Sequence, residues 1–151
     1  MKLITLTTTI LLATSAAAVA DSHGDPAQAG AHFIENWDLD GDGQVTLREA
    51  TEKRGDVFYM FDKDENDVLD DAEYLLFDET RQADMNMNAG GYKKGPMKRA
   101  NRGLSRDFND TDGNGEVSKE EFTIRSSDWF DLIDRNSDGV VTKDDFGPDK
   151  S

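Results

Sequence analysis

The stretch 38–49, with the sequence DLDGDGQVTLRE, decides how this chain of 151 residues folds. Acidic side chains occupy its positions 1, 3, 5 and 12, a glycine occupies position 6, and valine occupies position 8. Glycine adopts the positive φ angle that a tight loop requires. Four carboxylates in so short a loop repel one another unless a positive charge lies among them. The pattern therefore predicts a loop that closes around a cation.

This stretch resembles the calcium loop of the EF-hand family. Such a loop surrounds Ca²⁺ with six to eight oxygens at ~2.3–2.6 Å. Side chains at positions 1, 3, 5 and 12 supply most of them, the carbonyl of position 7 supplies another, and position 9 often acts through water. The resemblance implies that the ligands in the first loop are Asp38, Asp40, Asp42, the carbonyl of Gln44, Thr46 and Glu49.

Three further stretches repeat the pattern, each with an apolar residue at position 8 and an acid at position 12. The implied ligands of the second loop are Asp62, Asp64, Asn66, Val68 through its carbonyl, Asp70 and Glu73. Those of the third are Asp110, Asp112, Asn114, Glu116 through its carbonyl, Ser118 and Glu121. Those of the fourth are Asp134, Asn136, Asp138, Val140 through its carbonyl, Thr142 and Asp145. The chain is therefore expected to bind up to four Ca²⁺ ions.

Two of these loops depart from the pattern. Asp67 replaces glycine at position 6 of the second loop, and aspartate tolerates a positive φ better than most residues do. Asp145 replaces glutamate at position 12 of the fourth loop and is one methylene shorter. The shorter side chain lowers the expected coordination number toward six, and Mg²⁺ accepts six ligands in octahedral geometry. We expect Mg²⁺ to compete most strongly at the fourth loop.

Spacing along the chain indicates an internal duplication, because the first two loops start 24 residues apart and so do the last two. Apolar residues at −5, −4 and −1 before the first, second and fourth loops predict a helix before each loop. The third loop differs, with Leu104 and Phe108 at −6 and −2. We predict an all-α EF-hand fold of four helix–loop–helix units in two tandem pairs, over residues 32–79 and 107–146. A linker rich in Met, Gly and basic residues (80–106) and a tail (147–151) complete it.

Only twelve residues, 50–61, separate the first loop from the second. One continuous helix over about 46–61 would hold the two loops ~24 Å apart, so that loops would pair across the two halves. A break at Arg54-Gly55-Asp56 would instead allow neighbouring loops to pair. The second half has a matching candidate break at Ser126-Ser127-Asp128, where Ser or Asp could cap a helix. The helix-unfriendly residues in both halves favour the broken version.

Residues 1–20 have the features of a secretory signal peptide. Lys2 precedes a mostly apolar run, and Ala18-Val19-Ala20 is typical of a cleavage site. A membrane anchor is the alternative, but the run is short and rich in threonine for crossing a ~30 Å hydrocarbon core. We expect an exported protein, periplasmic or secreted, with no transmembrane span after cleavage and a disordered leader over residues 21–31.

The charge of the chain excludes some classes of partner. The net charge is −15, and removal of Lys2 with the signal peptide makes it −16, which disfavours binding to nucleic acid. Four Ca²⁺ ions would halve that charge, so the composition indicates a metal-dependent fold. The absence of cysteine excludes disulfides and thiolate sites. A basic cluster between Lys93 and Arg106 could contact an acidic lobe or an anionic partner, although a solvated linker is the simpler interpretation.

The chain most closely resembles exported bacterial proteins with several closely spaced EF-hand loops, which share the signal peptide and the motif of Asp38–Gly43. This resemblance implies calcium-ion binding, as a buffer or a calcium-stabilised module. The alternative is a sensor that binds a protein partner when loaded. Met85, Met87 and Met97 fall in the predicted linker, which is a poor match to the Met-lined groove of such sensors. No catalytic motif is present, and His23 and His32 are poorly placed for catalysis, so we expect no enzyme.

Overall fold

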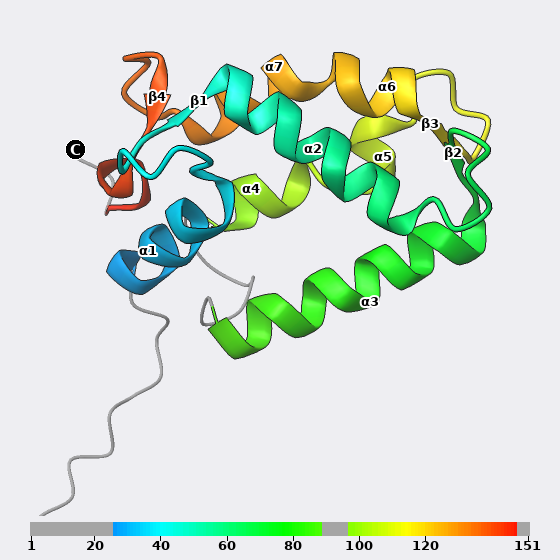
Figure 1. Cartoon of the computed structure of the whole chain (residues 1–151), viewed down its shortest axis with the longest axis horizontal. Coiled ribbons are helices and arrows are strands. Elements are labelled where there is room, and N and C mark those ends of the chain that lie inside the picture. The colour runs from blue at the N-terminus through cyan, green and yellow to red at the C-terminus, as the bar shows by residue number, and fades with distance from the viewer. Residues whose placement is uncertain (1–25, 89–96, 148–151) are drawn as a thin grey trace, which may run out of the picture.

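The computed structural model describes residues 26–88 and 97–147 and is mostly helical, with two short two-stranded sheets (Figure 1). The elements in chain order are α1 (Pro26–Trp37), β1 (Val45–Thr46), α2 (Leu47–Phe61), β2 (Val68–Leu69), α3 (Asp71–Asn88), α4 (Met97–Arg102), α5 (Arg106–Asn109), β3 (Val117–Ser118), α6 (Lys119–Ile124), α7 (Ser126–Ile133), β4 (Val140–Val141) and the 3₁₀ helix η1 (Lys143–Phe146). Among the described residues, none of the helices combines the length and apolarity needed to cross a bilayer. The predicted signal peptide and most of the tail lie outside these residues.

Helix α1 begins earlier than the sequence suggested. It starts at Pro26, and proline suits the first helical position because its fixed φ matches a helix and its missing N–H has no partner there. The predicted disordered leader over 21–31 is therefore wrong from Pro26 onward. Gly30 lies against η1, since a Cβ at this position would come within 3.1 Å of Phe146. The first and last described helices therefore pack together.

Helix α2 is continuous, so the favoured break at Arg54-Gly55-Asp56 is wrong. Its first turn is closed by a capping box, in which Thr46 and Glu49 satisfy each other's backbone N–H groups. A glycine inside a helix costs only about 1 kcal/mol. The buried Phe58 and Phe61 on one face of α2 outweigh that cost. At 1.5 Å per residue, α2 holds the loops at its two ends about 22 Å apart.

Loops pair across the two halves of the chain and not within each half, which corrects the predicted tandem pairs. Strand β1 pairs with β4 in antiparallel fashion, and β2 pairs with β3. Each sheet therefore joins one loop from each half, the first with the fourth and the second with the third, at opposite ends of the molecule (Figure 1). The residues at position 8 of the four loops are fully buried in these sheets: Val45, Leu69, Val117 and Val141.

The second half of the chain breaks where α6 meets α7, one residue before the predicted position. Arg125 forms the junction, and its side chain extends to the carbonyl of Phe108 at 2.9 Å. Ser126 was one of the candidate helix caps, but it is the first residue of α7, and its hydroxyl accepts a hydrogen bond from Arg54 Nε at 3.1 Å. The Ser126 side chain therefore connects α7 with α2.

The segment 80–106 is largely structured and does not form the predicted linker. Helix α3 continues to Asn88, and α4 starts at Met97; residues 89–96, with Lys93 and Lys94, lie outside the described part. Met85 and Met97 are 4% and 6% exposed and belong to the core. Of the basic cluster, Arg106 forms an ion pair with Asp71 of α3. The described parts of this segment, 80–88 and 97–106, thus belong to the fold.

Two hydrophobic cores lie at the two ends of the molecule, and Arg54 lies between them. The first core contains Trp129 and surrounds β1 and β4, whereas the second contains Phe122 and surrounds β2 and β3. The Arg54 guanidinium lies 4.1 Å from the centroid of the Phe122 ring and 5.0 Å from that of Trp129. A buried cation in contact with aromatic faces on both sides is stabilised by cation–π attraction.

Hydrogen bonds satisfy most of the donors of this buried guanidinium. Besides Ser126, Arg54 donates to the carbonyls of Gly103 at 3.0 Å and Phe122 at 2.7 Å, and to Asn109 Oδ1 at 2.7 Å. Burial lowers the pKa of Arg54 to about 9, so it stays protonated at neutral pH. Asn109 in turn donates to the Tyr74 hydroxyl at 3.3 Å. These bonds connect α2 with the elements on both sides of it.

Candidate metal sites

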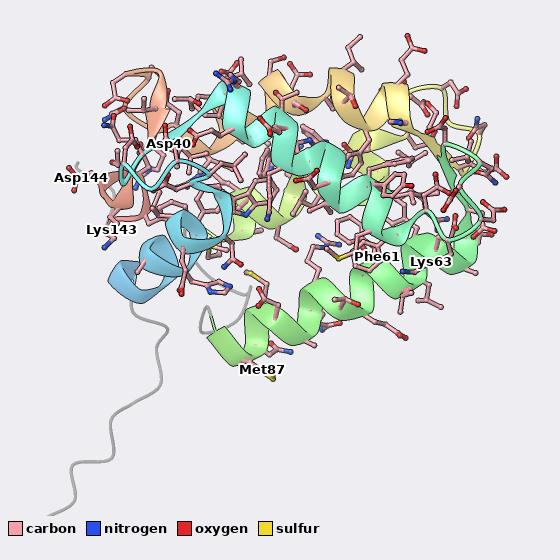
Figure 2. The ribbon with its side chains drawn as sticks, in the orientation of Figure 1. Asp40, Phe61, Lys63, Met87, Lys143 and Asp144 are labelled. Carbon is pink, nitrogen blue, oxygen red and sulfur yellow. The ribbon has the colours of Figure 1, made fainter. Side chains whose placement is uncertain are left out.

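Four acidic loops lie in two groups at the two ends of the molecule. Figure 2 shows Asp40 of the first loop at the same end as Lys143 and Asp144 of η1, whereas Lys63 of the second loop lies at the opposite end. Helix α2 begins at the end of the first loop and stops at the start of the second, where Asp62 is its C-cap. The pairing of the strands therefore determines which loops are neighbours.

All four loops share the same backbone conformation, with a positive φ at positions 4 and 6. The residues concerned are Gly41 and Gly43, Glu65 and Asp67, Gly113 and Gly115, and Ser137 and Gly139, with φ values between 57° and 89°. Asp67 has a φ of 62°, as its replacement of glycine required. The requirement at position 4 was missed, although glycine occupies that position in the first and third loops.

A swap of residues at position 4 tests the cost of this conformation. Glu65 has a φ of 58°, a region where a side chain costs about 1–2 kcal/mol. We expect Glu65→Gly to raise the free energy of unfolding by about 0.5–1 kcal/mol, since the added flexibility of the unfolded chain offsets part of the gain. The reverse change in the first loop, Gly41→Glu, is the matched comparison and lowers stability. Urea titrations followed by circular dichroism measure the stability of both variants. A loss of stability in Glu65→Gly would contradict backbone strain at Glu65.

The aspartate at position 1 organises each loop through the backbone. Both carboxylate oxygens of Asp38 accept hydrogen bonds, from Gly41 N–H at 2.7 Å and Gly43 N–H at 2.8 Å. Asp62, Asp110 and Asp134 accept equivalent bonds from positions 4 to 6 of their own loops. The backbone therefore wraps around one fixed carboxylate in every loop.

The acid at position 12 closes each loop. Glu49 Oε1 accepts the N–H groups of Leu39 at 3.0 Å and Asp40 at 3.3 Å, and Oε2 accepts that of Thr46 at 2.9 Å. Glu73 and Glu121 make equivalent bonds to positions 2 and 9 of the second and third loops. A single carboxylate thus holds both arms of its loop, one oxygen to each arm.

Asp145 takes the same place in the fourth loop despite its shorter side chain. Its Oδ1 accepts the N–H of Arg135 at 2.9 Å, and its Oδ2 accepts that of Thr142 at 2.8 Å. The segment around it is the 3₁₀ helix η1, which is wound more tightly than an α-helix. Asp145 is 2% exposed. The exit helix of the fourth loop is thus a 3₁₀ helix, and the shorter acid accepts hydrogen bonds from the same two loop positions, 2 and 9, as the glutamates do.

Position 9 has a structural role in all four loops. Thr46 Oγ1 accepts the N–H of Glu49 at 3.3 Å, and Asp70 Oδ1 accepts that of Glu73 at 2.9 Å. Ser118 accepts from Glu121 in the same way, whereas Thr142 accepts the N–H of Asp144, one residue before the closing acid. These side chains were predicted as ligands acting through water; in the structure they cap the following helix. At position 7, Gln44, Val68, Glu116 and Val140 each donate their N–H to position 5 of their loop.

Carboxylate oxygens converge in three of the loops closely enough to share one ion. The oxygens of Asp38, Asp40 and Asp42 lie within 4.8 Å of one another, and so do those of Asp62, Asp64 and Glu73, and of Asp110, Asp112 and Glu121. In the fourth loop Asn136 supplies an amide and donates to Asp138 at 2.7 Å. Such all-oxygen sets fit a hard divalent cation, and each group of like charges is repulsive without one. These clusters could therefore hold metal ions.

Acid should destabilise the metal-free protein through the loop-closing glutamates. Burial raises the pKa of Glu121, but hydrogen bonds from Ser118 and Thr111 outweigh it and lower the pKa from 4.5 to about 2. The bond from the Thr46 backbone likewise lowers the pKa of Glu49. Because the folded-state values are lowered, the contribution is complete above pH 4.5 and lost as the pH falls toward 2.

Thermal melts in chelator between pH 6 and pH 2.5 measure this loss. Glu121→Gln cannot titrate, so its midpoint should start lower and fall less over the same range. Glu79→Gln, at an exposed glutamate of α3 outside the loops, is the control and should follow the parent. If the melting temperatures of the parent and of Glu121→Gln fall in parallel with pH, protonation of Glu121 does not destabilise the fold.

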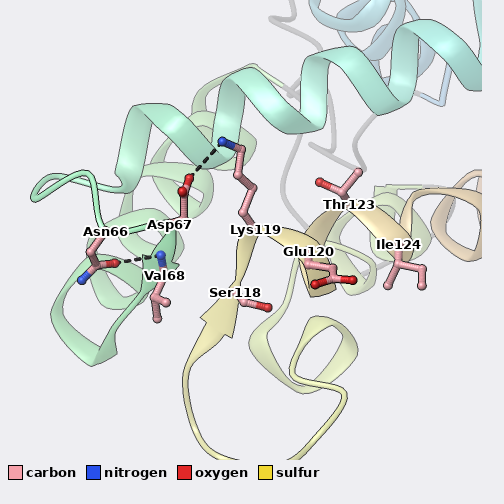
Figure 3. A pocket seen from close by; sticks show the side chains of 8 residues that line it. All are labelled: Asn66, Asp67, Val68, Ser118, Lys119, Glu120, Thr123 and Ile124. Atoms are coloured by element: carbon pink, nitrogen blue, oxygen red, sulfur yellow. Dashed lines mark hydrogen bonds and ion pairs between the residues drawn. The ribbon is translucent and has the colours of Figure 1, made fainter.

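A cross-half ion pair lies beside the second sheet. Figure 3 shows Lys119 of α6 extending to Asp67, with Nζ 2.9 Å from Oδ1, and Asn66 accepting from the Val68 backbone. The N–H of Lys119 also donates to the Asp67 carbonyl at 3.0 Å. This pair raises the pKa of Lys119. The residue that replaced glycine thus joins the second and third loops.

Comparison with known proteins supports part of this picture. A family model described as EF hand matches residues 108–123 and 127–147, which contain the third and fourth loops. The chain matches no curated protein and no solved structure. In these two segments it is similar to EF hands, a result that suggests calcium binding. The first and second loops lie outside the match, and only their geometry relates them to the third and fourth loops.

Proposed function

We propose that this protein binds up to four Ca²⁺ ions, one in each acidic loop, in two pairs at the ends of the molecule. The observation that carries the proposal is the repetition of one geometry. In every loop the position-1 aspartate accepts the N–H of position 6 and the position-12 acid accepts that of position 2, although the four sequences differ. Four unrelated turns would not be expected to share all these contacts.

The donor set favours Ca²⁺ and ranks the loops. Bound Ca²⁺ would neutralise the converging carboxylates and join the two arms of each loop. Asp38, Asp40, Asp42 and Glu49 in the first loop would serve this ion with four carboxylates. The fourth loop ends in Asp145, whose oxygens are held by both arms. We expect this loop to be the site where Mg²⁺ competes best, because an aspartate favours six-fold coordination over higher numbers.

The surroundings of the loops favour a calcium-stabilised module or buffer over a sensor. A sensor opens a groove when helices separate. Here α2 belongs to both pairs of loops, and Arg54 at its middle is fixed to α7 and to three further acceptors. Opening one pair would break this buried network. Export to a compartment with abundant calcium is consistent with this role and with the signal peptide expected for residues 1–20.

Calorimetric titration of the chain with Ca²⁺ tests the proposal. We expect up to four ions per chain, and we expect Glu49→Gln, Glu73→Gln and Glu121→Gln each to lose about one, since each removes the acid that closes a loop. Asp145→Asn should do the same for the fourth loop. Repeating the titration in Mg²⁺ should weaken the Ca²⁺ affinity of the parent more than that of Asp145→Asn.

The control is Glu79→Gln, which removes the same charge from α3 away from the loops. It should bind as many ions as the parent. Equal ion numbers in all variants, or no binding in the parent, overturn the assignment of the sites.

A further inference from the structure

A cavity of about 340 Å³ lies among α1, α2, α3 and α4, and none of its described lining residues belongs to the acidic clusters of the loops. Its wall is mostly apolar and includes Met60, Met85 and Met97 as well as Trp37, Phe77 and Trp129. The volume is within the range of about 300–1,000 Å³ that small-molecule sites have in proteins. Apolar walls of this kind favour the burial of a hydrocarbon chain.

The three methionines in this wall were not expected to meet. The sequence placed Met85 and Met97 in a linker, and a Met-lined groove was considered a poor match for that reason. Helix α3 extends to Asn88 and α4 starts at Met97, so both side chains reach the cavity that Met60 of α2 also lines. Methionine is flexible and polarisable, and it adapts to apolar ligands of varied shape.

Polar groups in the wall carry a net positive charge. Of the described lining residues, Lys53 and Arg81 are cationic and one, Asp84, is a carboxylate, which lies 2.8 Å from His32 Nε2. Arg81 directs Nη1 to Asn101 and Nη2 to Asp78. Lys53 forms no ion pair with the described residues, so its charge is available to a ligand in the cavity.

We propose that this cavity binds a small organic anion with an apolar tail, of the type of a straight-chain carboxylate. The apolar wall would bury the tail, and Lys53 and Arg81 would hold the carboxylate. In a chain with a net charge of −15, a wall whose described residues include Lys53, the Asp78-paired Arg81 and one carboxylate is electrostatically distinct from its surroundings. This charge selects an anion over a cation of the same size.

The site does not depend on metal for its lining, but it shares elements with the loops. Trp37 and Phe61 line the cavity, and each immediately precedes the first residue of a loop. If the loops bind Ca²⁺, the affinities for anion and ion are reciprocally linked. Measuring binding in Ca²⁺ and in chelator separates the two proposals, because anion binding can occur whether or not Ca²⁺ binds.

Intrinsic fluorescence provides the test, since both tryptophans of the chain, Trp37 and Trp129, line the cavity. The probes are decanoate, decanol and decylammonium, below their aggregation concentrations. We expect decanoate to change the emission saturably with one molecule per chain, and to bind about tenfold more tightly than decanol, as one charged hydrogen bond implies. Decylammonium that binds in the cavity as tightly as decanoate overturns the proposal.

Two pairs of variants localise the binding. Lys53→Gln removes a cation from the wall, and Arg48→Gln removes one from the exposed face of the same helix. Val57→Phe adds volume in the wall, and Ile124→Phe adds it on the surface of α6, where Ile124 is 67% exposed. We expect Lys53→Gln and Val57→Phe to weaken decanoate binding at least fivefold, and the two surface variants to leave it unchanged. The proposal fails if both members of each pair behave alike.

Discussion

Replacing Arg54 with alanine is expected to lower the free energy of unfolding by about 3–5 kcal/mol, a large fraction of the stability of a small domain. Arg54 is fully buried and donates to Ser126, to Asn109 and to the carbonyls of Gly103 and Phe122. Each buried acceptor that loses its donor costs about 1–3 kcal/mol. Alanine also leaves a void between the Phe122 and Trp129 rings, so packing is lost as well.

Urea unfolding followed by circular dichroism, in saturating Ca²⁺ and in chelator, measures this loss. Arg48→Ala is the matched control, because Arg48 lies on the exposed face of the same helix, and surface changes usually stay within about 0.5 kcal/mol. Arg54→Lys keeps the charge but not the planar set of five donors, so it should recover only part of the stability. If Arg54→Ala unfolds at the same urea concentration as Arg48→Ala, the buried network does not join the two cores.

Replacing Gly103 with alanine is expected to cost about 3 kcal/mol, the upper end of the usual effect of overpacking. A Cβ at this position would lie 1.7 Å from Trp129 Cδ1, far inside any real contact. Trp129 has little freedom to move, because it is fully buried and its indole N–H donates to the Ala100 carbonyl at 2.8 Å. The turn between α4 and α5 or the indole ring would have to shift, and the Gly103 carbonyl accepts from Arg54.

Gly55→Ala provides the control for this substitution. Gly55 lies in the interior of α2, and outside the adjacent backbone of this helix no described atom would lie within 4 Å of an added Cβ. Alanine there should raise the free energy of unfolding by about 0.5–1 kcal/mol, through the higher helix propensity of alanine. The midpoints of thermal and urea unfolding should therefore fall for Gly103→Ala and rise for Gly55→Ala. Equal stability of Gly103→Ala and the parent would show that the α4–α5 turn yields to the methyl group.

The acidic loops could be predicted from the sequence almost in full. Their acidic pattern is local, since twelve consecutive residues contain the turn-forming glycines, the position-1 aspartate and the closing acid. Position 8 is apolar in all four loops, and its residues, such as Val45 and Leu69, are fully buried. What the local pattern missed was the second strained position, where Glu65 and Ser137 adopt a positive φ without glycine.

The structure of α2 could not be predicted in this way, and the reason is energetic. Gly55 disfavours a helix by about 1 kcal/mol, and this cost can be inferred from the sequence alone. The compensating contacts come from residues 49 to 72 positions away along the chain, where Gly103, Asn109, Phe122 and Ser126 meet Arg54. Nothing near Arg54 in sequence indicates that a charged residue beside a glycine is buried.

Twelve neighbouring residues suffice to build each acidic loop, so the loops and the chemistry of their oxygens follow from local sequence. Which loops become partners depends instead on contacts between distant parts of the chain. The first loop pairs with the fourth and the second with the third because α2 is one rigid helix that holds consecutive loops apart. The same packing brought Met60, Met85 and Met97 to one cavity, a grouping that depends on how the helices meet and not on any local pattern.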